Sequence, residues 1–145
     1  MRFNQHFPDS FDFYHLGLVE KRHSPSDGRL DQALGPESRI GFAYEVKGES
    51  RTWIVVLFDP EMDPSVCSEM GNVLASRFAD RMSASEGGRV WISPPRSLSG
   101  PRLTAVMKDL LRRGTKTTYL HQAPKGWAEV EAWVLTAPWE GAADV

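Results

Sequence analysis

Two apolar runs joined by a short polar link limit the possible folds of this chain more than any other feature. The first run, Ile40 to Val46, alternates large apolar or aromatic residues with small or polar ones, and the second, Thr52 to Phe58, is rich in β-branched and aromatic residues. Both patterns favour strands, and the link Lys47 to Ser50 is short enough for a hairpin. We therefore expect an antiparallel β-hairpin here.

A long helix is predicted directly after this hairpin, from about Asp63 to Ala84. Asp63 or Ser65 offers an N-cap, and Pro64 suits the first turn, where its missing N–H does no harm. Gly87-Gly88 is expected to end the helix. Apolar residues recur at spacings of three and four, which is the helical period: Val66, Met70, Val73, Leu74, Phe78 and Met82.

The rest of the chain completes an α+β pattern. Arg89 to Ser93 predicts a short strand ended by Pro94-Pro95, and Pro101 to Arg113 predicts a second amphipathic helix. Thr117 to Gln122 and Trp127 to Thr136 predict a final hairpin, whose last strand alternates and should have one buried and one wet face. The expected fold is an antiparallel sheet built from hairpins and packed against two amphipathic helices. Two N-terminal segments are less regular: Phe11 to Val19, a strand or docking segment, and Lys21 to Ser38, a long loop.

Length and composition favour one ordinary domain over residues 1–145. A chain of 145 residues can bury a sufficient core without staples. The net charge of -2 gives no basis for nucleic-acid binding or for attraction to an anionic membrane. The single Cys67 excludes an internal disulfide and a cysteine-based zinc site. No apolar run is long enough for membrane insertion. We expect no secretory signal and a cytoplasmic location.

The long predicted helix carries a line of polar side chains. At about 100° per residue, Ser65, Glu69 and Asn72 fall within about 60° of one another, and Ser76 extends the line. We call these four residues the polar strip. An exposed helical face is normally polar, so spacing alone favours a solvated surface over a functional site.

Two residues indicate that the strip has a role beyond solvation. Asn72 is a poor helix former, and a mid-helix asparagine usually has a further reason. Gly71 beside it costs about 1 kcal/mol relative to alanine and lets another backbone approach closely. An amide can accept a hydrogen bond from a water and donate one to a neighbouring oxygen at once. The pair therefore indicates a role other than helix stability, and an amide is suited to orienting a neutral water molecule.

The strip and the segment after it resemble the CheC/CheX family of chemotaxis phosphatases, which dephosphorylate the response regulator CheY. The family's motif is Asp or Ser, three residues, Glu, two residues, Asn, some 21 or 22 residues, and Pro. This chain has Ser65, Glu69 and Asn72 at those spacings, and Pro94-Pro95 covers either length of the final gap. The resemblance extends over roughly Ile40 to Pro95.

The resemblance implies a mechanism. Asn72 would enter the active site of a phosphorylated CheY-type regulator and orient the attacking water, while Glu69 would pair with the regulator's lysine. Ser65 and Ser76 would lie in the partner contact, and Pro94-Pro95 would shape the neighbouring turn. No cofactor of its own is implied, because Mg²⁺ is supplied by the partner regulator. Relatives of this kind are similar in forming homodimers through sheet edges.

Some features depart from the family pattern, and alternatives stay open. The motif occurs once, as in CheX-like members, whereas CheC-like members tend to carry two copies. The helix predicted within Ser97 to Gly114 and the first 38 residues have no expected counterpart. One alternative is a non-catalytic relative that binds a partner or serves as a flagellar-switch scaffold. Another is an unrelated small α+β domain with a chance match.

Other residue types offer weaker candidates. The four histidines are scattered without metal-ligand spacing. Arg112-Arg113 matches the negative end of a helix dipole. The tryptophans Trp91, Trp127, Trp133 and Trp139 suggest sheet packing, with Trp133 a candidate for an exposed contact.

Overall fold

The computed structural model describes residues 18–20, 39–123, 126–136 and 139. The strand or docking segment predicted over Phe11 to Val19 lies outside these residues except at its end, where strand β1 begins. The loop predicted over Lys21 to Ser38 lies outside them altogether, as does the side chain of Trp127.

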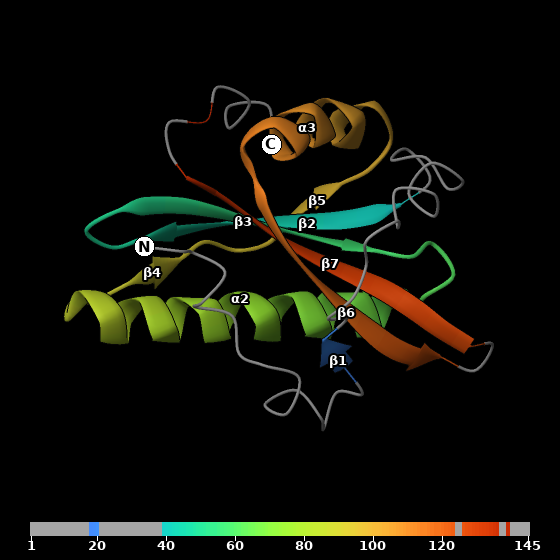
Figure 1. The fold of residues 1–145 in the computed structure, drawn as a ribbon, viewed down its shortest axis with the longest axis horizontal. Coiled ribbons are helices and arrows are strands. Elements are labelled where there is room, and N and C mark those ends of the chain that lie inside the picture. Colours follow the sequence, from blue (N-terminus) through green and yellow to red (C-terminus); the bar gives the residue numbers. More distant parts are fainter. Residues whose placement is uncertain (1–17, 21–38, 124–125, 137–138, 140–145) are drawn as a thin grey trace.

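The described residues form an antiparallel sheet in the order β1-β6-β7-β3-β2-β4, with β5 also pairing to β2 (Figure 1). β2 and β3 are the predicted hairpin, in which Ile40 pairs with Phe58 and Lys47 with Arg51. β6 and β7 are the predicted final hairpin. The strands are β1 Leu18–Glu20, β2 Ile40–Lys47, β3 Arg51–Phe58, β4 Trp91–Ile92, β5 Arg96–Leu98, β6 Thr115–Ala123 and β7 Gly126–Thr136.

Two helices cover opposite faces of this sheet, α2 (Pro64–Glu86) on one and α3 (Gly100–Arg113) on the other (Figure 1). Each helix lies within two residues of its predicted bounds at either end. The predicted fold class, an antiparallel α+β sheet built from hairpins and packed against two amphipathic helices, is confirmed.

Helix α2 begins and ends as its sequence dictates. The Asp63 side chain caps it by accepting from the Ser65 backbone N–H at 2.8 Å, and Pro64 occupies the first turn. Gly87 ends it in the left-handed conformation, with φ 74°. In its last turn, Glu86 accepts hydrogen bonds from the Glu49 N–H (2.9 Å) and the Ser50 hydroxyl (2.7 Å). These bonds tie the end of the helix to the β2–β3 turn.

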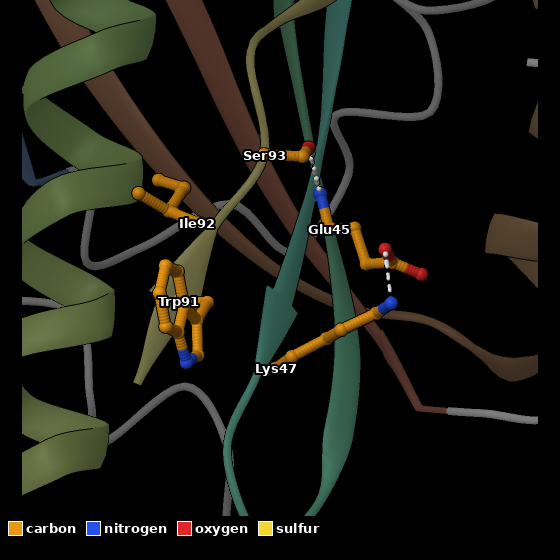
Figure 2. A pocket seen from close by; sticks show the side chains of 5 residues that line it. All are labelled: Glu45, Lys47, Trp91, Ile92 and Ser93. Atoms are coloured by element: carbon orange, nitrogen blue, oxygen red, sulfur yellow. Dashed lines mark hydrogen bonds and ion pairs between the residues drawn. The ribbon is translucent and has the colours of Figure 1, made fainter. Parts of the chain in front are cut away.

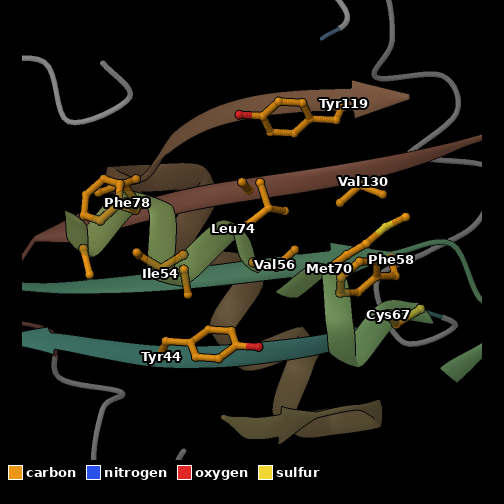
Figure 3. Packing of buried hydrophobic residues seen from close by; sticks show 14 of the residues in the cluster. Tyr44, Ile54, Val56, Phe58, Cys67, Met70, Leu74, Phe78, Tyr119 and Val130 are labelled. Atoms are coloured by element: carbon orange, nitrogen blue, oxygen red, sulfur yellow. The ribbon is translucent and has the colours of Figure 1, made fainter. Parts of the chain in front are cut away.

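The larger apolar cluster lies between α2 and the sheet (Figure 3). The spacing of the buried helix residues brings them to one side of α2, where they meet alternate residues of β2, β3, β6 and β7. Burying each large apolar side chain stabilises the fold by roughly 1.5–3 kcal/mol. The helix contributes Cys67, Met70, Leu74, Phe78 and Met82, and the strands contribute Tyr44, Ile54, Val56, Phe58, Tyr119 and Val130.

The opposite face of the sheet corrects the expectation of a wet face on the last strand. Trp133 is 5% exposed and Glu131 is 2% exposed, because both lie on the face that α3 covers. There Glu131 forms an ion pair with Arg39 (2.9 Å) and accepts a hydrogen bond from the Trp133 indole N–H (3.0 Å). Trp133 is therefore a core residue and not the exposed contact for which it was a candidate.

The segment between the helices holds a strand that was not predicted. β5 follows Pro94-Pro95 and pairs with Gly41 to Ala43 of β2. The strand predicted over Arg89 to Ser93 is shortened to β4, and its Trp91 is 65% exposed. The expectation that Trp91 packs on the sheet is thus wrong: β4 lies at the sheet edge, where nothing in the described chain covers that side chain.

Candidate functional site

The polar strip lies on the solvent side of α2. Ser65, Glu69, Asn72 and Ser76 are all exposed, whereas Met70, Gly71, Leu74 and Ala75 between them are buried. The strip runs directly beside the buried side of the helix. The structure therefore brings together all four residues of the predicted strip.

The four residues differ in their local partners. Ser65 is engaged by the N-cap, since its hydroxyl donates to Asp63 Oδ1 at 2.6 Å. The hydrogen bonds from the Ser65 hydroxyl and backbone N–H lower the pKa of Asp63. Within the part of the chain that the structure describes, the Glu69 carboxylate makes no ion pair or hydrogen bond. Glu69 is thus an exposed negative charge available to an external cation.

Asn72 has one hydrogen-bond partner among the described residues. The hydroxyl of Tyr44 donates to Asn72 Oδ1 at 3.0 Å, across 28 positions of sequence. Tyr44 is 1% exposed and comes from β2, so it reaches the strip from beneath the helix (Figure 3). Burial raises the pKa of the Tyr44 hydroxyl, which therefore remains protonated and able to donate.

Gly71 makes this contact possible. A Cβ at this position would lie 2.6 Å from the Tyr44 hydroxyl oxygen, far closer than real Cβ contacts. The expectation that Gly71 admits another backbone is corrected: the group that passes over it is the Tyr44 side chain. The unfavourable glycine beside Asn72 indicates from the sequence that a group approaches closely, but it does not identify that group as Tyr44.

Pro94 and Pro95 lie between β4 and β5, along the edge of the sheet formed by β2. Ser93 bonds to Glu45, whose backbone N–H donates to the Ser93 hydroxyl at 2.8 Å, and Arg96 pairs with Ala43. The two prolines therefore span the stretch opposite Tyr44, and both are exposed. Tyr44 links the two parts of the motif, because its backbone lies beside the prolines and its side chain contacts Asn72.

A hollow beside this edge was not predicted from the sequence. It is lined by Glu45, Lys47, Trp91, Ile92 and Ser93, where β4 lies against β2 (Figure 2). Trp91 and Ile92 are 65% and 39% exposed, and Lys47 Nζ lies 3.4 Å from Glu45 Oε1. The sequence signal that could have indicated it is the short apolar segment between Gly87-Gly88 and Pro94-Pro95.

The remaining chemistry of the described chain is limited. No group of three or more His, Cys, Asp or Glu in the described ranges is placed to hold a metal ion. Cys67 is fully buried in the larger apolar cluster, and burial raises the pKa of its thiol to about 11. Neither described helix is long and apolar enough to cross a membrane.

Comparison with known proteins gives structural neighbours only. No family model matches the sequence, and no curated protein matches it. The fold is similar to a chain in the crystal structure of the CheX-CheY-BeF3-Mg+2 complex from Borrelia burgdorferi, with 17% identity, a TM-score of 0.46, and coverage of 70% of this chain and 78% of that one.

Two further neighbours carry related names. The chemotaxis protein CheX from Vibrio vulnificus is 13% identical over 86% of this chain and 89% of that chain, with a TM-score of 0.44. A CheC-like superfamily protein from Shewanella sp. PV-4 is 10% identical over 91% of this chain and 94% of that chain, also with a TM-score of 0.44. The names of these neighbours are those of the family whose motif the sequence resembles.

Proposed function

We propose that this protein accelerates the dephosphorylation of a phospho-aspartyl CheY-type response regulator. The observation that carries the proposal is the arrangement of the motif. Glu69 and Asn72 stand exposed on one side of α2, and Pro94-Pro95 lies beside the tyrosine that contacts Asn72. A carboxylate, an amide and a rigid turn on one surface suit the docking of another protein's active site.

The chemistry asks little of the helper protein. In hydrolysis of an aspartyl phosphate, the water oxygen forms a bond to phosphorus while the bond from phosphorus to the aspartate oxygen breaks. Inorganic phosphate and a free carboxylate result, and the water's proton passes to phosphate or solvent. Catalysis of such a step rests on positioning and on charge stabilisation. An exposed amide that both donates and accepts is suited to holding the water in line.

The remaining strip residues have binding roles in this proposal. Glu69 pairs with the regulator's active-site lysine, and Ser65 and Ser76 contact its surface along the same helix. Pro94 and Pro95 form a second, rigid contact at the sheet edge. The Mg²⁺ belongs to the regulator, so this chain contributes residues and not a metal. The proposal retains a cytoplasmic location and a homodimer through sheet edges, the latter testable by sedimentation velocity.

The experiment is the decay of a phosphorylated CheY-type receiver with and without this protein. Wild type should accelerate the decay. Asn72→Ala should lower the protein-dependent rate of decay by at least about 100-fold while the fold remains intact. Lys108→Ala, an exposed change on α3 at the opposite face, serves as the control and should be fully active. A fully active Asn72→Ala would contradict the mechanism.

The assay also separates the alternative functions. Unchanged decay together with measurable binding would support the non-catalytic partner-binding or flagellar-switch relative. If the protein neither accelerates the decay nor binds the receiver, the result would support an unrelated small α+β domain.

A further inference from the structure

We infer that Tyr44 is a positioning residue for this reaction, holding the Asn72 amide in the orientation that places the water. The inference rests on the proposed function and adds to it a residue outside the family-like motif. Its basis is the 3.0 Å hydrogen bond from the Tyr44 hydroxyl to Asn72 Oδ1.

An exposed asparagine is a poor positioning group without such a contact. Its terminal torsion is broad and roughly two-fold, so the carbonyl and the NH₂ group exchange places readily in solvent. A hydroxyl donating to Oδ1 favours one of these orientations. It leaves the NH₂ group and the second lone pair of Oδ1 for groups outside the protein.

Tyr44 is itself held rigidly, which makes it an effective fixed point. Its side chain is 1% exposed and belongs to the core beneath α2. The neighbouring Phe42 packs against Phe58 with ring centroids 6.1 Å apart. The hydroxyl thus stands at the boundary between a packed interior and the exposed strip. A hydrogen bond accepted by the carbonyl also polarises the amide and strengthens its N–H groups as donors.

Gly71 gives an independent indication that this contact matters. Glycine is unfavourable in the middle of a helix, yet it stands where a side chain would collide with the Tyr44 hydroxyl at 2.6 Å. The helix gives up local stability at the residue whose Cβ would meet the Tyr44 hydroxyl. Such a sacrifice fits a contact that serves the neighbouring Asn72.

The test compares two tyrosine-to-phenylalanine changes in the same core. Tyr44→Phe keeps the ring and removes only the hydroxyl that contacts Asn72. Tyr119→Phe makes the same change at another fully buried tyrosine, on β6, which is separated from β2 by β7 and β3. Tyr44→Phe should lower kcat for receiver dephosphorylation by about tenfold and leave KM unchanged, because docking is unaffected. Tyr119→Phe should leave both unchanged.

A second variant separates this role from simple helix anchoring. In the Asn72→Ala background, adding Tyr44→Phe should lower the rate no further, since the amide it positions is gone. In ¹⁵N-labelled protein, the Asn72 side-chain NH₂ signals, assigned by their loss in Asn72→Ala, should shift toward those of unrestrained amides in Tyr44→Phe.

The outcomes distinguish this inference from the proposed function. If wild type accelerates decay and Asn72→Ala does not, but Tyr44→Phe keeps full kcat, the positioning role is overturned and the proposed function stands. If wild type fails to accelerate decay of any phosphorylated receiver that it binds, the proposed function and this inference both fall.

Discussion

The two helices cover opposite faces of one sheet but are built differently. α3 has 14 residues, ends with Arg112 and Arg113 in its last turn, and packs four buried apolar residues over the tryptophans of the sheet. α2 has 23 residues, with no acidic residue in its first turn and no basic residue in its last. It contains a mid-helix glycine and asparagine that lower its intrinsic stability. Both helices thus dock onto the sheet, but α2 also contains residues that are unfavourable for a helix beside its exposed strip.

The contacts of each helix follow the same division. At α3, Asp109 accepts from the Trp139 indole N–H at 2.8 Å and pairs with Arg112 at 3.3 Å. The first contact joins the helix to Trp139, and the second lies within the helix itself. At α2, the Tyr44 bond leads outward to the exposed Asn72. A helix that departs from favourable composition at one place is therefore a better indicator of a site than a helix that is favourable throughout.

The largest expected effect comes from truncating the apolar contacts of either helix. Leu74 of α2 and Leu110 of α3 are both fully buried. Changing either to alanine should lower the free energy of unfolding by about 2–5 kcal/mol, through lost burial and the cavity left behind. Urea denaturation followed by tryptophan fluorescence measures this. Leu110→Ala should keep the full dephosphorylation rate per folded molecule, and a lower rate would show that the two faces are not separate in function.

The next largest effect concerns Gly71. Gly71→Ala should destabilise the protein by about 1–3 kcal/mol, because the added methyl collides with the Tyr44 hydroxyl. In Tyr44→Phe, the nearest remaining ring atom lies 3.6 Å away, an ordinary contact. There the same change should be neutral or stabilise by up to about 1 kcal/mol, since alanine favours the helix. Equal effects in the two backgrounds, measured by urea denaturation, would contradict the close approach.

A smaller effect is expected from the charge of Glu69. Glu69→Gln keeps the shape of the side chain and removes its charge, so KM for the phosphorylated receiver should rise about tenfold, or about 1.4 kcal/mol, with kcat unchanged. Glu49→Gln, an exposed change in the β2–β3 turn, is the matched control. A drop in kcat without a change in KM would assign Glu69 to the chemistry and not to docking.

The smallest effect is the pH dependence of the α2 N-cap. Because folding lowers the pKa of Asp63, its stabilising contribution is complete above the unfolded value of about 3.9 and is lost as the pH falls through the folded value. Asp63→Asn also caps a helix but does not titrate. The two proteins should melt at similar temperatures at pH 7, and below about pH 4 wild type should lose thermal stability faster, as followed by circular dichroism. Parallel curves would show that Asp63 does not contribute in this way.

The parts of the fold that the sequence predicted depend on local pattern. The β2–β3 hairpin, both helices and the final hairpin each carry their own periodicity and their own turn or cap residues, such as Asp63 and Gly87. Strand β5 carries none. Arg96 to Leu98 form a strand only because the edge of β2, far earlier in the chain, offers backbone groups to pair with.

The burial of the last strand and the geometry of the site could not be predicted from the sequence, and for the same reason. The alternation of the last strand predicts a solvent-facing Glu131, but its partner Arg39 lies far away in the sequence and α3 covers that face of the sheet. The residues of the polar strip could be predicted from helical spacing, but the Tyr44 hydroxyl could not, because register between β2 and α2 is set by packing. In the sequence, Gly71 was the one sign that another group approaches the helix closely at this point.

The burial of Cys67 makes the strip open to chemical mapping. It is the single cysteine of the chain and is fully buried, and burial raises the pKa of its thiol to about 11, so little of the reactive thiolate forms at pH 7. The native protein is therefore nearly silent toward thiol reagents. Cysteines introduced singly at Ser65 or Ser76 would react alone, and their shielding by a bound partner would trace its outline along the helix without removal of any natural residue from the core.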